Sequence, residues 1–274
     1  TIVCCNTRKY HGLLVLPIEP GGDNHVLLSG LDETIIQHGQ AFNLGIHKYP
    51  GTYEPKGHKY IIDFKYEPIF SLIYRVGGVQ LKKEILMAHN EPLVMLRYTL
   101  LEATSDTWLR LKPFLAYRRV HELGKANLYA NTKYEEIPGG IRSRLYSGYP
   151  ALNMQVNRQN EFIPTPDWYY HVEYTEERLR GYDYQEDLFV PGYFEVSLKK
   201  GDSVIFSASF KEIVPAGLKK RFINELDKRP PKDNFIDCLK NSAAQFIVKR
   251  GKATEVVAGY PWFGRWGRDT FIAL

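Results

Sequence analysis

The chain has 274 residues, of which 44% are hydrophobic and 24% charged, and its formal net charge is +5 at pH 7. This length suffices for one large domain or two ordinary ones, and the composition is typical of a soluble globular protein. Because the basic residues are dispersed among acidic ones and no apolar run reaches the length of a membrane span, we expect neither nucleic acid nor a membrane as partner.

The chain contains three cysteines: Cys4 and Cys5 are adjacent, and Cys238 lies far along the sequence. An odd count with two adjacent residues argues against a disulfide framework, and no CxxC motif indicates structural zinc. We therefore expect a reducing, cytoplasmic compartment, with no metal and no cofactor.

From Gly12 to about Phe210, apolar or alternating runs of about 5–9 residues are separated by Gly, Pro and Asn, which is typical of antiparallel strands. One stretch alternates two sets of side chains, with Trp108, Arg110 and Lys112 on one face and Leu109, Leu111 and Pro113 on the other. So many strands exceed what one open twisted sheet usually holds, which predicts two stacked sheets. The fold class expected is mainly β, a large antiparallel sandwich.

The segment from 135 to 192 is less regular, and we interpret "RGYDYQEDLFVPG" as a long polar loop between the strands "WYYHVEY" and "YFEVSL". "DSVIFSASF" is predicted to be the last strand of the sandwich. Long ordered loops in compact domains are often functional.

Beyond Pro215 the pattern changes. Residues 215–233 predict a linker with a short helix, and the apolar spacing after Asn234 predicts a longer helix with Asn234 as its N-cap and Gly251 as its stop. The expected organisation is a β-sandwich domain over 1–214, a linker over 215–233, and the start of an α-helical domain over 234–274.

Three motifs could carry chemistry. The first, "NTRKYHG", offers Arg8, Tyr10 and His11 just before a strand. The residue chemistry favours a turn with solvated cations over a functional loop. A catalytic triad around His11 is excluded, because the sequence contains no G-x-S-x-G nucleophile elbow.

The second motif places Asp183, Glu186 and Asp187 within five residues, between tyrosines. Carboxylates beside aromatic rings suit sugar binding, since they accept hydrogen bonds from hydroxyls while the rings stack on the C–H faces. A Ca²⁺ loop is a second interpretation, although the EF-hand spacing is absent, and a solvated acidic turn is a third.

The third motif is "AGYPWFGRWGRDTFIAL", which gathers Trp262, Trp266, Arg268 and Asp269 around glycines. Clustered aromatic residues usually form the core of a helix start, and Arg268 beside Asp269 fits a helix N-terminus. However, Gly264 and Gly267 interrupt a regular packing stripe and let a ligand approach the backbone.

Together, "NTRKYHGLLV", "RGYDYQEDLFVPG" and "GYPWFGRWGRDTFIAL" resemble glycogen-debranching enzymes of the amylo-α-1,6-glucosidase type, in that family's order and over essentially the whole chain. The resemblance implies a β-supersandwich followed by an (α/α)6 barrel that hydrolyses glucosidic bonds, of which this sequence contains only the first helices. It implies two partners: a branched α-glucan such as glycogen or limit dextrin, and the rest of the barrel. No residue indicates the glucanotransferase barrel of the dual-activity eukaryotic form.

"WGRDT" is similar to a motif that lines the terminal-glucose pocket in related (α/α)6 glucosidases. The resemblance implies that Arg268 and Asp269 bind glucose hydroxyls, while Trp266, and with it Trp262, forms the pocket wall. Bond cleavage in the family inverts the anomeric centre and needs an acid and a base on separate carboxylates.

We assign no catalytic residue, because both catalytic carboxylates are expected beyond Leu274, so the fragment is expected to be inactive. Sandwich loops approach the barrel mouth in the family, which implies that six residues form an interdomain or substrate rim: Arg8, Tyr10, His11, Asp183, Glu186 and Asp187.

Alternatives remain. The chain could be a non-catalytic carbohydrate-binding or interaction domain, or part of a glucoamylase-like α-1,4-glucosidase or a disaccharide phosphorylase with the same architecture.

Overall fold

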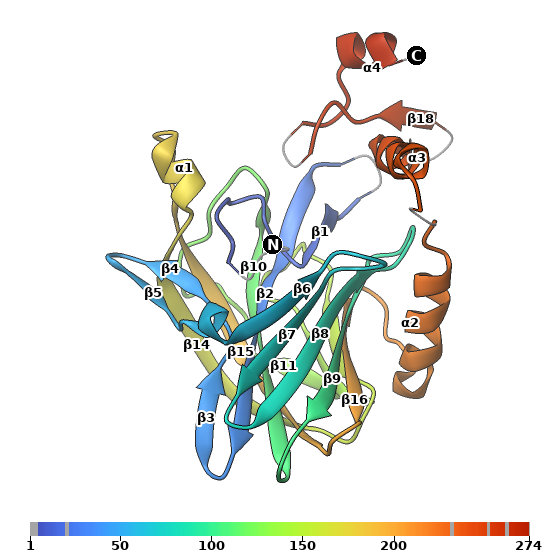
Figure 1. Ribbon diagram of the computed structural model, residues 1–274. Coiled ribbons are helices and arrows are strands. Elements are labelled where there is room, and N and C mark those ends of the chain that lie inside the picture. The colour runs from blue at the N-terminus through green and yellow to red at the C-terminus, as the bar shows by residue number, and fades with distance from the viewer. Residues whose placement is uncertain (1–4, 20–21, 231–232, 251–252, 261–262, 274) are drawn as a thin grey trace.

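The computed structural model describes residues 5–19, 22–230, 233–250, 253–260 and 263–273. Two antiparallel sheets face each other across one hydrophobic core, and helices follow them in the chain (Figure 1). The mainly β sandwich predicted from the alternating pattern is therefore confirmed.

The first sheet has six strands in the order β1-β2-β10-β15-β14, with β3 paired to β2. Its strands are β1 (Leu14–Pro17), β2 (Asn24–Gln37), β3 (Gln40–Asn43), β10 (Thr107–Arg119), β14 (Glu161–Glu173) and β15 (Gln185–Leu198).

The second sheet has eight strands in the order β11-β12-β13-β16-β9-β8-β7-β6. Its strands are β6 (Ile61–Lys65), β7 (Ser71–Val76), β8 (Val79–Met87), β9 (Leu93–Glu102), β11 (Tyr134–Ile137), β12 (Gly140–Ser143), β13 (Leu152–Val156) and β16 (Ser203–Ser209). Hairpin β4–β5 (His47–Tyr49 and Thr52–Glu54) leads to a 3-10 turn over Gly57–Tyr60.

The alternation predicted for β10 is confirmed. Leu109 and Leu111 belong to the core between the sheets, whereas Trp108, on the opposite face, is 45% exposed. Because successive strand residues point to opposite faces, the first half of this strand, over 107–113, presents one apolar and one polar surface.

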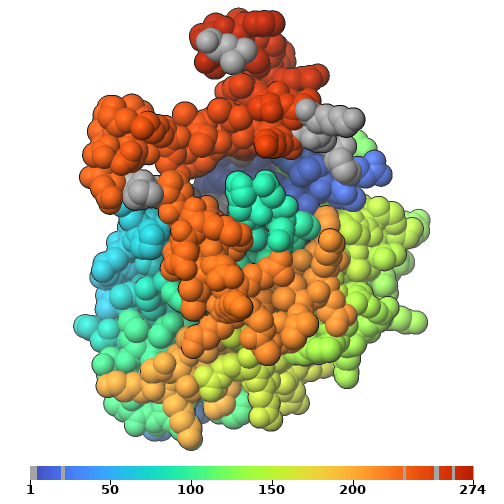
Figure 2. Space-filling model, turned by 90° about the vertical axis from the view of Figure 1, so that its right-hand side faces the viewer, coloured from blue at the N-terminus to red at the C-terminus, as the bar shows by residue number. Residues whose placement is uncertain are grey.

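Helix α2 (Leu218–Asp227) follows a 3-10 turn at Pro215–Gly217 and packs on the second sheet, as both views show (Figures 1 and 2). Leu218 and Phe222 are buried against strand residues that include Leu86 and Met95. The Arg97 guanidinium lies 4.3 Å from the centre of the Phe222 ring. This part of the predicted linker is thus packed onto the sandwich.

Helix α3 (Phe235–Phe246) begins as predicted, because the Asn234 side chain accepts a hydrogen bond from the Asp237 amide at 3.0 Å. It ends earlier than predicted. Ile247–Arg250 forms strand β17, which pairs with β18 (Ala253–Val256), and the expected stop at Gly251 lies outside the described residues. The β-branched pair Ile247 and Val248 favours this extended conformation.

The polar loop predicted over 180–192 is wrong. The chain forms helix α1 (Thr175–Leu179), and β15 begins at Gln185 and pairs with the end of β14. Leu188 and Val190 in this stretch are buried, which explains why a sequence with acidic residues forms a strand.

The segments after α2 stand over one end of the sandwich. In Figures 1 and 2, α3, β18 and α4 (Gly267–Ala273) lie beyond the sheets, at the end that also holds the N-terminal segment. None of the described helices is long and apolar enough to cross a membrane.

We expect α2 to contribute strongly to stability through one side chain. Replacing the fully buried Phe222 with Ala should lower the free energy of unfolding by about 3–5 kcal/mol, since it leaves a cavity and removes the ring against which the Arg97 guanidinium packs. Urea unfolding measures this effect. The neighbouring Ile223→Ala change, at a position 40% exposed, should cost less than about 1 kcal/mol. Equal effects would show that α2 does not dock as described.

Candidate functional site

The first two sequence motifs meet at one end of the sandwich. The N-terminal loop around Arg8 lies against helix α1, with the Glu176 amide donating to the Thr7 carbonyl at 3.0 Å. The Arg8 guanidinium lies 3.6 Å from the carboxylates of both Glu176 and Glu177. Segments about 170 residues apart in the sequence therefore form one surface, at the end over which the C-terminal segments stand (Figure 1).

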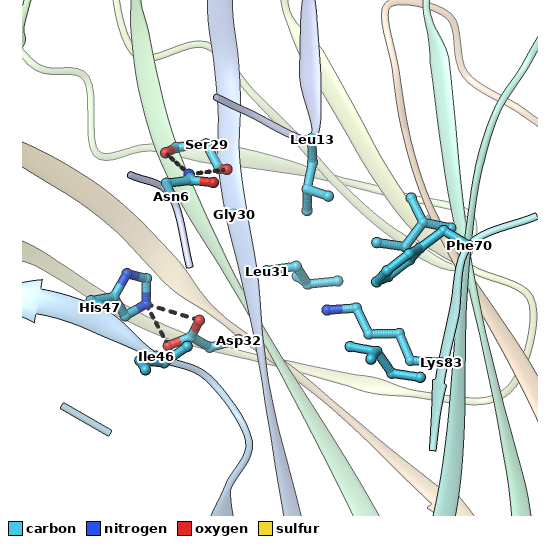
Figure 3. Close-up of a pocket in the computed structure, with 12 residues that line it drawn as sticks. Asn6, Leu13, Ser29, Gly30, Leu31, Asp32, Ile46, His47, Phe70 and Lys83 are labelled. Carbon is cyan, nitrogen blue, oxygen red and sulfur yellow. Dashed lines mark hydrogen bonds and ion pairs between the residues drawn. The ribbon is translucent and has the colours of Figure 1, made fainter. Parts of the chain in front are cut away.

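The N-terminal loop is anchored to strand β2 through Asn6. The Asn6 amide donates to the Ser29 carbonyl at 3.0 Å and to its hydroxyl at 3.3 Å (Figure 3). Within the loop, His11 Nδ1 accepts a hydrogen bond from the Thr7 amide at 3.3 Å. The proton of neutral His11 therefore resides on Nε2.

Burial lowers the pKa of His11 to about 4, and neighbouring positive charge, Arg8 included, adds to the effect. The imidazole is consequently neutral at pH 7. It acts here as a hydrogen-bond acceptor for the loop backbone.

An ion pair beneath the loop joins β10 to β15. The Arg118 guanidinium, 4% exposed, binds Glu186, 0% exposed, through two nitrogens. The Tyr174 hydroxyl donates a hydrogen bond to the Glu186 carboxylate, and the Gly124 amide donates another to it at 3.0 Å. Arg118 Nη2 also donates to the Lys9 carbonyl at 2.7 Å, which ties the N-terminal loop to this pair.

Tyr174 remains a donor throughout the physiological pH range. Burial, followed by the adjacent Glu186 charge, raises the pKa of this phenol well above its ordinary value.

Asp187 also accepts hydrogen bonds from the backbone of this chain. Its two oxygens accept hydrogen bonds from the His171 amide at 2.8 Å and the Ala126 amide at 3.0 Å. Two of the three carboxylates interpreted as sugar or Ca²⁺ ligands, Glu186 and Asp187, thus hold the loop over 121–131 through the Gly124 and Ala126 amides. Asp183, in contrast, is exposed at the surface. The described residues contain no group of three His, Cys, Asp or Glu side chains placed to hold a metal.

Tyr10 packs beside the loop that follows β10. Its hydroxyl lies 3.2 Å from His121 Nδ1, and the two rings meet edge-on at 5.4 Å. Farther along that loop, Leu128 and Tyr129 are almost fully exposed. Apolar side chains so exposed on an ordered loop suit contact with another surface.

A small cavity lies between the sheets below the N-terminal loop (Figure 3). On one side, His47 Nε2 lies 2.9 Å from an Asp32 carboxylate oxygen. Lys83, on β8 of the second sheet, extends into the cavity and forms an ion pair at 2.6 Å with Glu33 on β2. Its volume is about 50 Å³, which holds a few water molecules and excludes a glucose unit.

The third motif lies apart, at the C-terminal end. Trp266 is 56% exposed, and helix α4 begins at Gly267. The side chains of Arg268 and Asp269 are 77% and 41% exposed, with 4.0 Å between Nε and Oδ2. Trp262 lies outside the described residues. The structure places this motif on an open surface, not in a helix core.

Sequence reasoning missed Arg118, Tyr174 and Glu177, which hold the first two motifs together. Arg118 carried a signal, since a charged residue on the apolar strand "PFLAYRRV" needs a buried partner. Glu177 is fully buried between Arg8 and Arg180, yet "TEERLR" reads as an ordinary charged surface helix.

The described chain is a two-sheet sandwich followed by helices, and an exposed aromatic and charged motif lies at the start of the last described helix, α4. Residues 1–205 match the family described as glycogen debranching enzyme N terminal, and residues 241–274 match the family described as amylo-alpha-1,6-glucosidase. The chain belongs to the glycogen debranching enzyme N-terminal family. The resemblance that its motifs indicated is thereby confirmed.

Solved structures resemble the chain distantly. A bacterial glucoamylase complexed with acarbose has 6% identity and a TM-score of 0.42, with 89% of this chain and 37% of that chain covered. A polysaccharide lyase has 10% identity and a TM-score of 0.27, with 74% and 28% covered. This chain therefore spans about a third of each of those proteins. No curated protein matches the sequence.

The buried pair should control the stability of this end. Glu186→Gln leaves the Arg118 charge enclosed without a counter-charge, so the free energy of unfolding should fall by about 3–5 kcal/mol. Chemical denaturation measures the change. The matched control is Glu195→Gln, whose partner Arg110 is partly solvated, and it should cost about 1 kcal/mol or less. A tolerated Glu186→Gln would contradict the burial described.

His11 should make stability depend on pH. Between pH 6.5 and about 4, the unfolded chain binds a proton at His11 that the folded chain does not bind. The contribution of His11 to the free energy of unfolding is fully present above pH 6.5 and decreases as the pH falls to about 4. His11→Gln should flatten the profile in this window. A profile insensitive to His11→Gln would refute the lowered pKa.

Proposed function

We propose that this chain is the N-terminal region of a glycoside hydrolase that removes α-1,6-linked glucose from branched α-glucans such as glycogen. One observation carries the proposal: two family matches follow each other in one chain, in the order sandwich then glucosidase domain. The "WGRDT" motif falls within the second match. We further propose the division into a sandwich over 1–214, a linker over 215–233 and the start of a catalytic domain over 234–274, acting in glycogen catabolism in the cytoplasm.

In this proposal, Trp266, Arg268 and Asp269 form one wall of a pocket for the terminal glucose, together with Trp262. Their exposure supports the assignment, because side chains that bind a substrate cannot be consumed by the core of the fold. A guanidinium and a carboxylate make charge-assisted hydrogen bonds to sugar hydroxyls, while an indole covers an apolar sugar face.

Inverting hydrolysis requires one carboxylic acid to protonate the glycosidic oxygen and one carboxylate to activate water, about 6.5–9.5 Å apart. Asp269 is the acid at the pocket motif, and we assign it to substrate binding. We infer that the acid and base are not among residues 1–274, so this chain alone should release no glucose.

The end of the sandwich that faces the C-terminal segments supplies the proposed rim. Arg8, Tyr10, His11 and the exposed Asp183 lie on loops there, and the buried Glu186 and Asp187 hold those loops in place. The exposed pair Leu128 and Tyr129 fits the same interdomain surface.

The test compares a full-length protein containing this region with its Asp269→Ala variant. The parent should release glucose from a phosphorylase-limit dextrin. Asp269→Ala should lower kcat/KM by roughly 10- to 100-fold, since a hydrogen bond to a charged group is lost. Asp227→Ala, at the exposed end of α2, serves as the control and should keep full activity.

Hydrolysis of linear maltooligosaccharides, with none of the limit dextrin, would replace the proposal with a glucoamylase-like α-1,4-glucosidase. Full activity of a folded Asp269→Ala protein would remove Asp269 from the pocket. Glucose release by the 274-residue chain itself would contradict the placement of the acid and base.

A further inference from the structure

The outer face of the first sheet has a covered half and an open half. Near the site described above, Phe114 and Val190 are buried in a small cluster under the N-terminal loop and the β4–β5 hairpin. Farther along β10, on the same side of the strand, Lys112 and Arg110 are partly exposed and Trp108 is 45% exposed. No described element covers this second half with a hydrophobic cluster.

A groove of about 320 Å³ lies where the two halves meet. It exists because β14 bulges between Pro164 and Asp167, where its register against β15 shifts. Opposite the bulge, Gly192 has φ +149° and its backbone approaches β14 so closely that a Cβ would lie 2.3 Å from the Ile163 carbonyl oxygen. The groove is thus formed by the backbone of both strands and not by loose side-chain packing.

The groove walls combine aromatic rings with hydrogen-bonding groups. Its lining residues are Lys112, Thr165, Pro166, Asp167, Tyr169, Val190 and Tyr193. One Asp167 oxygen accepts from the Trp168 amide at 2.8 Å, and the carboxylate is otherwise exposed. The Tyr169 hydroxyl accepts from Lys112 Nζ at 2.7 Å, so its own proton is available to a ligand.

The chemistry of the groove favours a neutral polyhydroxyl ligand. The positive charge of Lys112 and the negative charge of Asp167 leave the groove without net charge, whereas a phosphate or a nucleic acid would need a positively charged site. The polar groups are too many for an apolar protein segment, whereas rings beside paired donors and acceptors match the alternating C–H faces and hydroxyls of a sugar. The volume falls within the range of small-molecule sites, which begins at about 300 Å³.

The surface beyond the groove extends this pattern. The Arg110 guanidinium stacks 4.0 Å from the centre of the Tyr193 ring and pairs with Glu195 at 2.7 Å. Trp108 lies four residues before Lys112 on β10, about 14 Å along the strand. Rings therefore flank a polar middle section over a length that fits several sugar units in a row.

We propose that this face, from the groove at Tyr193 to Trp108, binds a stretch of α-glucan chain at a second site separate from the glucose pocket. The choice of an α-glucan rests on the proposed function; the groove itself does not. Such a site holds the enzyme on a branched polymer while the pocket processes chain ends, which raises the effective concentration of the ends.

Calorimetric titration of the 274-residue chain with maltoheptaose tests the site. Tyr193→Ala should weaken binding by roughly tenfold or more, as truncation of a central aromatic anchor does. Thr165→Arg fills the groove from an exposed position and should abolish binding without affecting folding. Thermal unfolding checks that both variants fold.

Two controls separate this inference from the proposed function. Tyr66→Ala removes a ring that is 53% exposed next to the second sheet, and this variant should bind maltoheptaose as the parent does. The β-linked cellohexaose should not bind.

Undetectable maltoheptaose binding, or unchanged binding by the folded Thr165→Arg chain, overturns the second site and leaves the glucosidase proposal standing. Equal binding of cellohexaose overturns its α-glucan selectivity. Binding lost in the folded Thr165→Arg chain but kept in Tyr66→Ala supports the second site, even if the full-length protein releases no glucose from limit dextrin.

Discussion

The buried ion pair between Arg118 and Glu186 is the constraint on which the rest of the site depends. Two charges removed from water are tolerated only when every hydrogen-bonding position is satisfied, and here Tyr174, the Gly124 amide and the Lys9 carbonyl complete the set. Each partner comes from a different part of the chain. The pair therefore fixes the relative positions of the N-terminal loop, the loop after β10 and the start of β15 at once.

The sandwich was predictable because its signals are local. Alternation along β10 and turns at Gly and Pro depend on neighbouring residues, and the Asn234 cap acts three residues away on the Asp237 amide. Each local preference agrees with the final fold, as expected for a sequence that folds to one structure. The three site motifs were likewise visible, because they concentrate unusual residue types over short stretches.

The error over 180–192 has a different origin. Glu186 and Asp187 indicate a solvated loop when only the neighbouring sequence is considered, because an acidic residue is rarely buried alone. Arg118, the partner that permits burial of Glu186, lies 68 residues earlier in the sequence. Backbone amides from distant segments donate hydrogen bonds that stabilise the Asp187 carboxylate. The early end of α3 has the same cause, since pairing with β18 decides between helix and strand for Ile247 and Val248.

The polar and aromatic residues that stand out in the sequence are of two kinds, those buried with a distant partner and those on the surface. The acidic motif that most resembles a ligand site contributes mainly buried carboxylates that organise loops. The residues proposed to contact a ligand lie elsewhere: the exposed Trp266, Arg268 and Asp269 at one end, and the exposed Trp108 with the partly exposed Tyr193 on the sheet. Such a division suits the polymer substrate proposed above. In that proposal one chain end enters the pocket while the rest of the branched molecule remains outside it, and the second site proposed on the sandwich binds part of the chain that the pocket cannot contain.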